Sequence, residues 1–157
     1  LYLYASELLK SAGFERYEIS NFAKDGKNSK HNTKYWLGDD YLGIGPAAHS
    51  FVNGKRFYYN RDIKAYLLNP TEIDDGEGGT AEETLMLRLR LNSGIDLAEF
   101  LSAFSGDITE NTINRILKKA ELFKNCGLVT INNNKISLTD KGALVSNAII
   151  TSFAELL

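Results

Sequence analysis

The run Leu128-Val129-Thr130-Ile131-Asn132-Asn133-Asn134-Lys135-Ile136-Ser137-Leu138 contains the clearest folding signal of the chain. Two short apolar runs flank three asparagines, and asparagine tolerates the positive φ that a tight turn demands. The run therefore predicts a β-hairpin.

Helices are expected on both sides of this hairpin. Thr80, Asp96 and Thr109 are each suited to cap a helix, and Glu83 forms a capping-box arrangement with Thr80. Apolar residues follow each cap at helical spacing: Leu85, Met86 and Leu89; Leu97, Phe100, Leu101 and Phe104; Ile113, Ile116, Leu117, Ala120 and Phe123. Thr139 can cap one closing helix. Three helices, a hairpin and a helix are the order of a winged-helix domain, which we expect over residues 80–157.

The beginning of the chain predicts a different architecture. Residues 3 to 11 have a helical pattern that Gly13 would end, and Tyr17 to Phe22 alternate like a strand. Such an αβ unit is typical of a parallel α/β sheet or barrel, so we assign residues 1–60 to the last portion of one. Residues 61–69 predict a brief helix, and the glycine-rich acidic stretch 74–79 predicts a linker, so 61–79 is read as the connection. The expected fold class is α/β plus mainly α.

Composition narrows the possible functions. The 157 residues carry a net charge of −2, and the third predicted helix mixes basic residues with Glu110 and Glu121 and so forms no basic stripe. Nucleic acid is therefore not an expected partner. No apolar run is long enough to span a membrane and no secretory signal is evident, so a cytoplasmic protein is expected. The only cysteine, Cys126, cannot hold an iron–sulfur cluster and is expected to be buried. The only methionine is Met86, which predicts a chain cut from a longer one.

Two neighbouring motifs contain both histidines and the only tryptophan. They are His31-Asn32-Thr33-Lys34-Tyr35-Trp36 and Gly43-Ile44-Gly45-Pro46-Ala47-Ala48-His49-Ser50. Flat aromatic rings beside imidazoles suit a planar, metal-bearing ligand, and glycine allows the backbone to come close to it. A functional site is therefore expected here.

These motifs resemble a known family. Four segments are similar to the C-terminal half of the HemW haem chaperones: Tyr17-Glu18-Ile19-Ser20-Asn21-Phe22-Ala23, His31-Asn32-x-x-Tyr35-Trp36, Tyr41-Leu42-Gly43-Ile44-Gly45-Pro46 and Ala48-His49-Ser50-Phe51. The HemW haem chaperones are radical S-adenosylmethionine proteins, which are often labelled oxygen-independent coproporphyrinogen III oxidase-like. Glu83 to Arg90, Gly127-Leu128-Val129 and Leu138-Thr139-x-x-Gly142 resemble that family's C-terminal domain. The resemblance implies the terminal portion of a partial, TIM-like radical SAM barrel followed by the winged-helix-like domain.

The family's cofactors would be held mainly outside this chain. Its cysteine triplet, which binds a 4Fe–4S cluster, is absent, so the chain alone is expected to perform no radical chemistry. By resemblance, Ala23 would contact S-adenosylmethionine, and Gly43 and Gly45 would let a loop approach the same cavity. A small residue at a crowded strand end explains Ala23 equally well. Ala47 replaces the family's third glycine, which weakens any claim that position 47 needs a positive φ.

The resemblance gives the His31 motif a haem-binding role. His31 would ligate haem iron, Asn32 would bond a propionate or orient the ring, and Tyr35 and Trp36 would stack on the porphyrin. Alternatively, Tyr35 and Trp36 are packing residues and His31 bonds to the backbone. His49 is the weaker candidate and is expected to be a supporting hydrogen-bonding residue.

Two functions follow from this reading. The first is a fragment of a haem chaperone that binds haem and delivers it to acceptor haem proteins. The second is a part of a coproporphyrinogen III oxidase, which needs the missing cluster-bearing half. A third and weaker possibility is that the helical domain recognises acceptor proteins or nucleic acid. An unpaired edge strand would also favour a homodimer.

Overall fold

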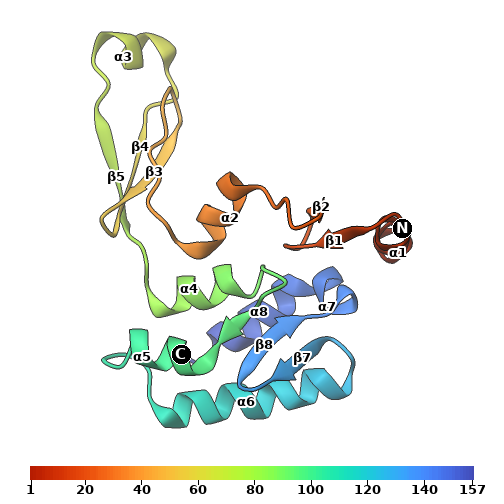
Figure 1. Ribbon diagram of the computed structural model, residues 1–157. Helices are drawn as coiled ribbons and strands as arrows, with labels where there is room; N and C mark the ends of the chain where they lie inside the picture. Colours follow the sequence, from red (N-terminus) through yellow and green to blue (C-terminus); the bar gives the residue numbers. More distant parts are fainter.

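The computed structural model describes residues 1–157 as an L-shaped molecule, with a body and one projecting arm (Figure 1). The body contains the C-terminal helices and a three-stranded sheet, and the N-terminal elements lie at one end of it. Helix α2 lies in the inner corner, where the arm joins. All strand pairs in the three small sheets are antiparallel.

The body follows the predicted order of elements. Its elements are α4 (Ala81–Arg88), β6 (Ile95–Asp96), α5 (Leu97–Ala103), α6 (Glu110–Asn125), β7 (Val129–Asn132), β8 (Lys135–Leu138), α7 (Asp140–Leu144) and α8 (Ser146–Ala154). Thr80, Asp96, Thr109 and Thr139 each accept a backbone N–H as helix caps, and Asn133 and Asn134 turn the hairpin with φ of 49° and 65°. The predicted closing helix is wrong in one respect: it breaks at Val145, whose φ of −119° is outside the helical range.

One apolar core holds the body together. Leu85, Leu97, Ile116, Ile149 and Phe153 are almost completely buried in it. Helix α4 is not covered on every side, since Met86 is 41% exposed. The expectation that Cys126 is buried is wrong: it is exposed because it lies just beyond the last turn of α6.

The N-terminal elements are α1 (Tyr2–Ser11), β1 (Phe14–Arg16) and β2 (Phe22–Lys24). Gly13 follows α1 with φ of 81°, as predicted. The predicted strand over Tyr17 to Phe22 is wrong except at Phe22, which begins β2, because residues 17–21 link the antiparallel pair β1–β2 and dock on the body. Glu18 forms an isolated bridge with Leu91, and Ile19 joins the core. The alternating pattern of this segment thus reflects docking rather than a ladder within a parallel sheet.

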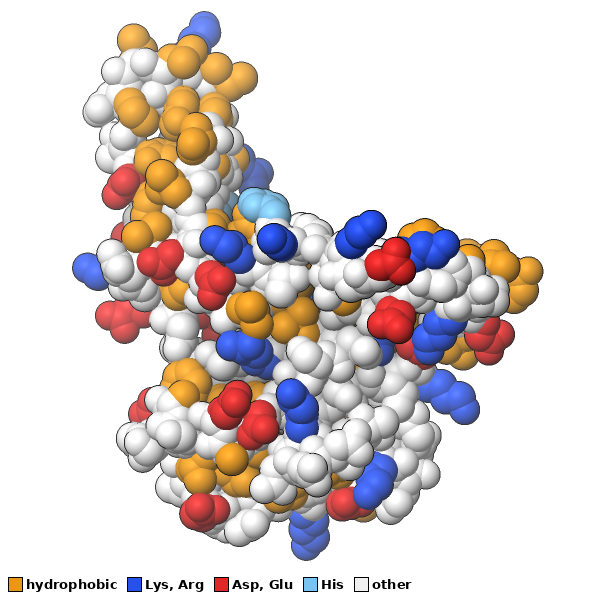
Figure 2. Space-filling model, viewed as in Figure 1, with side chains coloured by type: hydrophobic (Ala, Val, Ile, Leu, Met, Phe, Trp, Pro, Cys, Tyr) orange, Lys and Arg blue, Asp and Glu red, His pale blue; other side chains and the backbone are white.

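The arm contains β3 (His49–Val52), β4 (Lys55–Tyr59), α3 (Ile63–Leu68) and β5 (Glu72–Glu77), with the strand order β3-β4-β5. The predicted linker over 74–79 is mostly strand, because backbone pairing with β4 outweighs its acidic, glycine-rich composition. Apolar side chains run along the arm to its tip, where Ile63, Leu67 and Leu68 are exposed (Figure 2).

The architecture is a mixed α/β fold with small sheets. The barrel and winged-helix assignments, and the division at residues 60 and 79, stay predictions. None of the helices has the combination of length and apolarity needed to cross a membrane.

Candidate functional site

The first motif lies on helix α2 (Lys30–Leu37), which the sequence reading did not anticipate. Ser29 caps the helix by accepting the backbone N–H of Asn32 at 3.2 Å, and Gly38 ends it in the left-handed conformation with φ of 75°. A serine and a glycine that bracket eight residues are the signals that could have predicted it.

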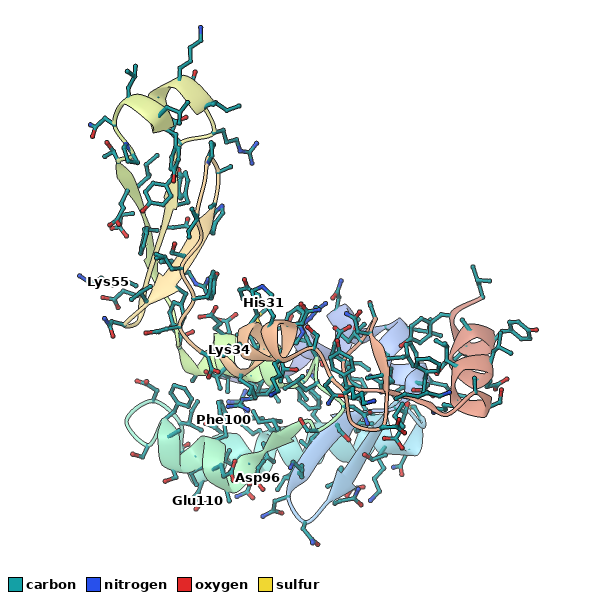
Figure 3. All side chains as sticks on the ribbon, turned by 45° about the horizontal axis from the view of Figure 1, so that its top comes forward. His31, Lys34, Lys55, Asp96, Phe100 and Glu110 are labelled. Carbon is teal, nitrogen blue, oxygen red and sulfur yellow. The ribbon has the colours of Figure 1, made fainter.

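His31 and Tyr35 share one exposed face of α2, because they are four residues apart. The Tyr35 hydroxyl lies 3.2 Å from His31 Nε2, and the two rings meet edge to face at 5.0 Å. Tyr35 also contacts Tyr41 with ring centroids 4.5 Å apart. Figure 3 shows His31 on α2 near the base of the arm. His31 therefore bonds to a side chain, and the motif presents an exposed imidazole within an aromatic cluster.

Trp36 faces the body. The guanidinium of Arg90 covers its ring at 4.7 Å, and both Trp36 Nε1 and Arg90 Nε are buried without a hydrogen-bond partner. Asn32 is half-buried, one turn before Trp36. The cation–π contact with Arg90 places one face of the indole in the packing between α2 and the body.

A cavity of about 190 Å³ lies where α2, α4 and the arm meet. Tyr35, Trp36, Tyr41, Phe51 and Arg56 are among its lining residues. Sites for drug-sized ligands measure roughly 300–1,000 Å³, so this cavity is too small to enclose a porphyrin. A planar macrocycle would instead have to lie on the exposed His31 face.

One ion pair fixes the arm to the body at this corner. Arg56 pairs with Glu83, whose other carboxylate oxygen accepts the backbone N–H of Gly79 at 2.7 Å. The Arg56 guanidinium also lies 4.9 Å from the Phe51 ring. The base of the arm is therefore held by charge and by aromatic contacts together.

The residues predicted to approach S-adenosylmethionine do not lie together. Ala23 lines a groove of about 360 Å³ with Thr33 and Leu37. These two residues lie about 200° around α2 from His31 and Tyr35, at roughly 100° per residue. The groove and the exposed imidazole are thus on opposite sides of the helix.

Gly43 and Gly45 lie against the arm. A Cβ on Gly43 would sit 2.2 Å from the carbonyl oxygen of His49, so its lack of a side chain serves close packing within the chain itself. Gly45 has φ of 115°, and its N–H donates to the Tyr66 hydroxyl at 3.2 Å. Ala47 has φ of 60°, so this position takes a positive φ although the family's glycine is absent. The turn between Gly45 and β3 requires that conformation, in which the Ala47 N–H donates to Tyr59 and Asn60 carbonyls.

His49, the second histidine, begins β3. Its Nδ1 lies 3.2 Å from Asp75 Oδ2, and its ring stacks on Tyr58 at 5.1 Å with an interplanar angle of 23°. An open cavity of about 530 Å³ adjoins it, lined by Ala47, His49, Tyr58, Asn60, Arg61, Ile73 and Asp75. The sequence reading missed this cavity because Asp75 was placed in a linker.

A buried polar network joins the N-terminal elements to the body. Arg16 donates from Nε to Asp140 Oδ1 at 2.9 Å and from Nη2 to the Leu138 carbonyl at 2.8 Å. Lys10 and Ser6 also donate to Asp140. Burial raises the pKa of Asp140, but hydrogen bonds from Lys10, Arg16 and Ser6, with the charge of Lys10, outweigh it, and the net pKa is lowered.

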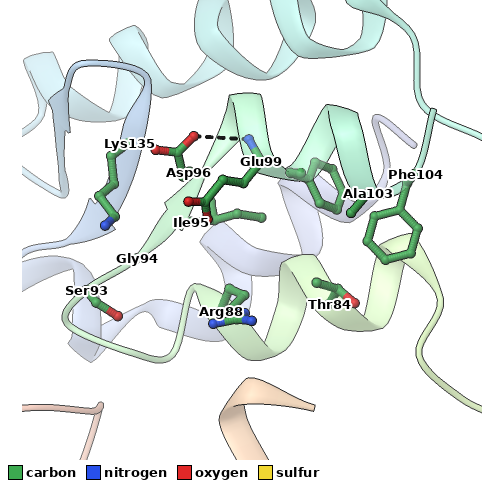
Figure 4. A pocket seen from close by; sticks show the side chains of 11 residues that line it. Thr84, Arg88, Ser93, Gly94, Ile95, Asp96, Glu99, Ala103, Phe104 and Lys135 are labelled. Carbon is green, nitrogen blue, oxygen red and sulfur yellow. Dashed lines mark hydrogen bonds between the residues drawn. The ribbon is translucent and has the colours of Figure 1, made fainter. Parts of the chain in front are cut away.

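The body has a separate cleft of about 280 Å³ between α4, α5 and the β6 segment (Figure 4). Arg88, Ser93, Glu99 and Lys135 contribute polar groups, and Phe100 contributes an aromatic wall. Asp96 accepts the backbone N–H of Glu99 at 3.2 Å at its edge. No residue of the two motifs lines this cleft.

The residues present do not fit an iron–sulfur cluster. Such a cluster takes three or four thiolates, and the chain has only Cys126. There is also no grouping of three or more histidine, cysteine, aspartate or glutamate residues that could hold a metal ion. The two histidines, each exposed and beside aromatic rings, are the side chains suited to ligate a haem iron.

Comparison with known proteins confirms the resemblance. Residues 80–145 match the family model described as the HemN C-terminal domain. The chain is also similar in fold to coproporphyrinogen III oxidase (HemN) from Escherichia coli, described as a radical SAM enzyme, with a TM-score of 0.68 and 16% identity over 99% of this chain and 40% of that one. At that identity the likeness concerns the fold alone.

The sequence comparisons are more specific. Heme chaperone HemW of Bacillus subtilis is 31% identical over 153 residues, and that of Lactococcus lactis is 31% identical over 162 residues. The alignments cover 92% and 98% of this chain but 39% and 41% of the relatives. Residues 80–145 are thus similar to the HemN C-terminal domain, and the sequence as a whole is similar to HemW-type haem chaperones. It spans about two fifths of the length of these relatives.

Proposed function

We propose that this chain is part of a haem chaperone, which binds haem and delivers it to acceptor haem proteins. The observation that carries the proposal is the exposed His31 imidazole on α2, set beside Tyr35 and Tyr41, in a chain similar to HemW proteins. The longer protein would work in the cytoplasm and hold the 4Fe–4S cluster and S-adenosylmethionine, with Ala23, Gly43 and Gly45 nearest to the latter. Coproporphyrinogen oxidation is the less favoured alternative.

In this proposal haem lies on the exposed face of α2. His31 ligates the iron, the Tyr35 ring contacts the macrocycle and Asn32 bonds a propionate. Trp36 supports the helix from below through its contact with Arg90. The Tyr35 hydroxyl occupies His31 Nε2 and must yield when this nitrogen ligates iron.

Haemin titration followed by Soret absorbance tests the proposal. We expect saturable binding by the 157-residue chain, at least about 10-fold weaker binding by His31→Ala, and unchanged binding by Lys30→Ala, an exposed neighbour on the same helix. Tyr35→Phe keeps the ring but frees Nε2, so it should bind haemin at least as tightly as the unmodified chain. Tight binding by His31→Ala would refute ligation by His31. Delivery would be followed as a second Soret shift on adding an apo-globin.

A further inference from the structure

We propose that the cleft between α4, α5 and β6 binds a free α-amino acid with an apolar side chain. The cleft measures about 280 Å³ and is formed by the body alone, since no residue of the His31 motif or of the glycine loop lines it. The inference therefore goes beyond the proposed haem function and does not depend on it. It follows from the charges on the walls of the cleft, from its aromatic end and from its size.

Side chains of both charges line this cleft without pairing with each other. Arg88 on α4 and Glu99 on α5 lie on facing walls (Figure 4), and neither forms an ion pair within the chain. A carboxylate can accept two parallel hydrogen bonds from a guanidinium, and an ammonium group can donate to a carboxylate. A ligand that carries a carboxylate and an ammonium group is therefore able to satisfy both walls at once.

A second cation, Lys135, is free in the same part of the cleft. Lys135 on β8 is the direct partner of Asp96 on β6, a position at which opposite charges usually attract each other. Asp96 Oδ1 instead accepts the backbone N–H groups of Ala98 and Glu99, at 2.9 and 3.2 Å, as the cap of α5. Lys135 has no ion-pair partner and lines the cleft beside Ser93. This end of the cleft thus offers two cations to the carboxylate of a ligand and Glu99 to its ammonium group.

The other end of the cleft is apolar. Phe100 is only 3% exposed, its ring lies 5.3 Å from that of Phe104, and Ala103 lines the cleft beside them. Figure 4 shows Phe104 at the end remote from Lys135 and Ser93. Burying an apolar side chain against this surface is favourable, because it removes the side chain from water. The cleft therefore orients a ligand with its charged head towards Ser93 and its side chain towards Phe104.

The size of the cleft favours a free amino acid over a longer ligand. Sites for drug-sized ligands measure roughly 300–1,000 Å³, and this cleft is just below that range. A free amino acid carries both charges on one carbon atom. Inside a peptide the same two groups are neutral amides, so an internal segment offers neither charge at that position.

The test is titration of the ¹⁵N-labelled 157-residue chain with L-phenylalanine, followed by ¹H–¹⁵N correlation spectra. We expect saturable shifts of the backbone amides of Gly94, Ile95 and Glu99, which line the cleft. L-phenylalanine amide lacks the carboxylate and N-acetyl-L-phenylalanine lacks the ammonium group. Each should bind about 10-fold or more weakly, because it leaves one charged wall without a partner.

Two variants assign the charged groups of the ligand to the walls. Arg88→Gln should bind L-phenylalanine about 10-fold or more weakly and should no longer distinguish it from its amide. Glu99→Gln should lose affinity to a similar degree and should no longer distinguish L-phenylalanine from its N-acetyl derivative. Arg115→Gln is the matched control, because it removes an exposed arginine of α6 that does not line the cleft, and its affinity should be unchanged. The same spectra show whether each variant is folded.

Shifts centred on the cleft, with this order of affinities, would support the inference. The absence of saturable shifts with L-phenylalanine, or equal affinity for L-phenylalanine and its two derivatives, would overturn it. Tighter binding of the blocked peptide acetyl-Glu-Phe-Lys-amide than of L-phenylalanine would also overturn it, in favour of a segment of a partner protein. None of these outcomes bears on haem binding, which the haemin titration tests separately.

Discussion

Replacing Asp140 with alanine should loosen the attachment of the N-terminal elements to the body. The Arg16 side chain is only 3% exposed, and Asp140 provides its sole compensating negative charge. The substitution leaves the guanidinium with two neutral acceptors, Asn92 Oδ1 at 3.1 Å and the Leu138 carbonyl at 2.8 Å. A buried cation that loses its anion is costly because it cannot regain water.

The expected loss is about 3 kcal/mol of unfolding free energy. Removing one partner of a buried pair costs roughly 3–5 kcal/mol, and the lower end applies because the Asp140 side chain is 24% exposed and Arg16 keeps two hydrogen bonds. Lys10 also pairs with Asp140, but its side chain is 52% exposed, so Lys10→Ala should cost no more than about 1 kcal/mol. For a chain of this size, a 3 kcal/mol loss corresponds to a fall in Tm of roughly 6–12 °C.

Urea unfolding followed by far-ultraviolet circular dichroism would measure both variants. Asp140→Ala should unfold at a clearly lower urea concentration than Lys10→Ala, with little change in the slope of the transition. Equal midpoints for the two variants would refute the view that burial of Arg16, rather than the number of ion pairs, sets the cost.

The remaining predictions concern pH and two positions of the glycine loop. The pKa of Asp140 is lowered in the folded chain, so the stabilisation by its carboxylate is complete above the unfolded pKa of about 3.9 and is lost as pH falls through the folded pKa. The difference in unfolding free energy between the unmodified chain and Asp140→Asn should therefore stay constant from pH 7 to about 5 and vanish in stronger acid. A difference that stays constant down to about pH 2 would contradict this prediction. Gly43→Ala should cost about 1–3 kcal/mol in urea unfolding, since its Cβ would meet the His49 carbonyl, whereas Gly106→Ala, with open space around it, should change stability by no more than about 0.5 kcal/mol. Ala47→Gly should stabilise the chain by about 0.5 kcal/mol, because the strain of a positive φ that it removes from the folded chain exceeds the conformational entropy that it adds to the unfolded chain. A loss of stability would show that the turn is unstrained.

Local chemistry made much of the body predictable. Helix starts were predictable from Thr80, Asp96 and Thr109, because in each case a side-chain oxygen accepts hydrogen bonds from backbone N–H groups within three residues. No distant partner is involved. The asparagine turn of the hairpin is a local feature for the same reason. Where contacts are local, sequence pattern and structure agree.

The wrong secondary-structure predictions concern segments whose conformation depends on contacts with distant parts of the sequence. Strand β5 has a composition typical of a linker, and only its pairing with β4 makes it a strand. Residues 17–22 alternate like a strand, but Ile19 is buried against helices more than 60 residues away in the sequence. The local sequence pattern does not predict strand pairing or docking of this kind.

The candidate site shows the same division. Residue types identified His31, Tyr35 and Trp36 as a group suited to a planar, metal-bearing ligand, and the family resemblance specified haem. The partner that covers Trp36 is Arg90, which is remote in the sequence. For His49 the deciding partner is Asp75, 26 residues away, which was assigned to a linker. The sequence could thus propose His31 as the stronger and His49 as the weaker candidate, but it could not predict that their partners are Tyr35 and Asp75.

The two histidines are connected through the corner of the molecule. Contacts run from His31 to Tyr35, from Tyr35 to Tyr41, and from Tyr41 to Phe51, which lies two residues from His49 on β3. The Arg56–Glu83 pair holds this strand region to α4, so α2 and the base of the arm are joined by packed rings and by charge. The His31 motif on α2 is thus joined to the base of the arm by these aromatic contacts and to the body by the ion pair. In the haem-chaperone role that we propose, an exposed His31 imidazole suits a cargo that must be handed on, because an enclosed cofactor site would keep the acceptor away from the iron.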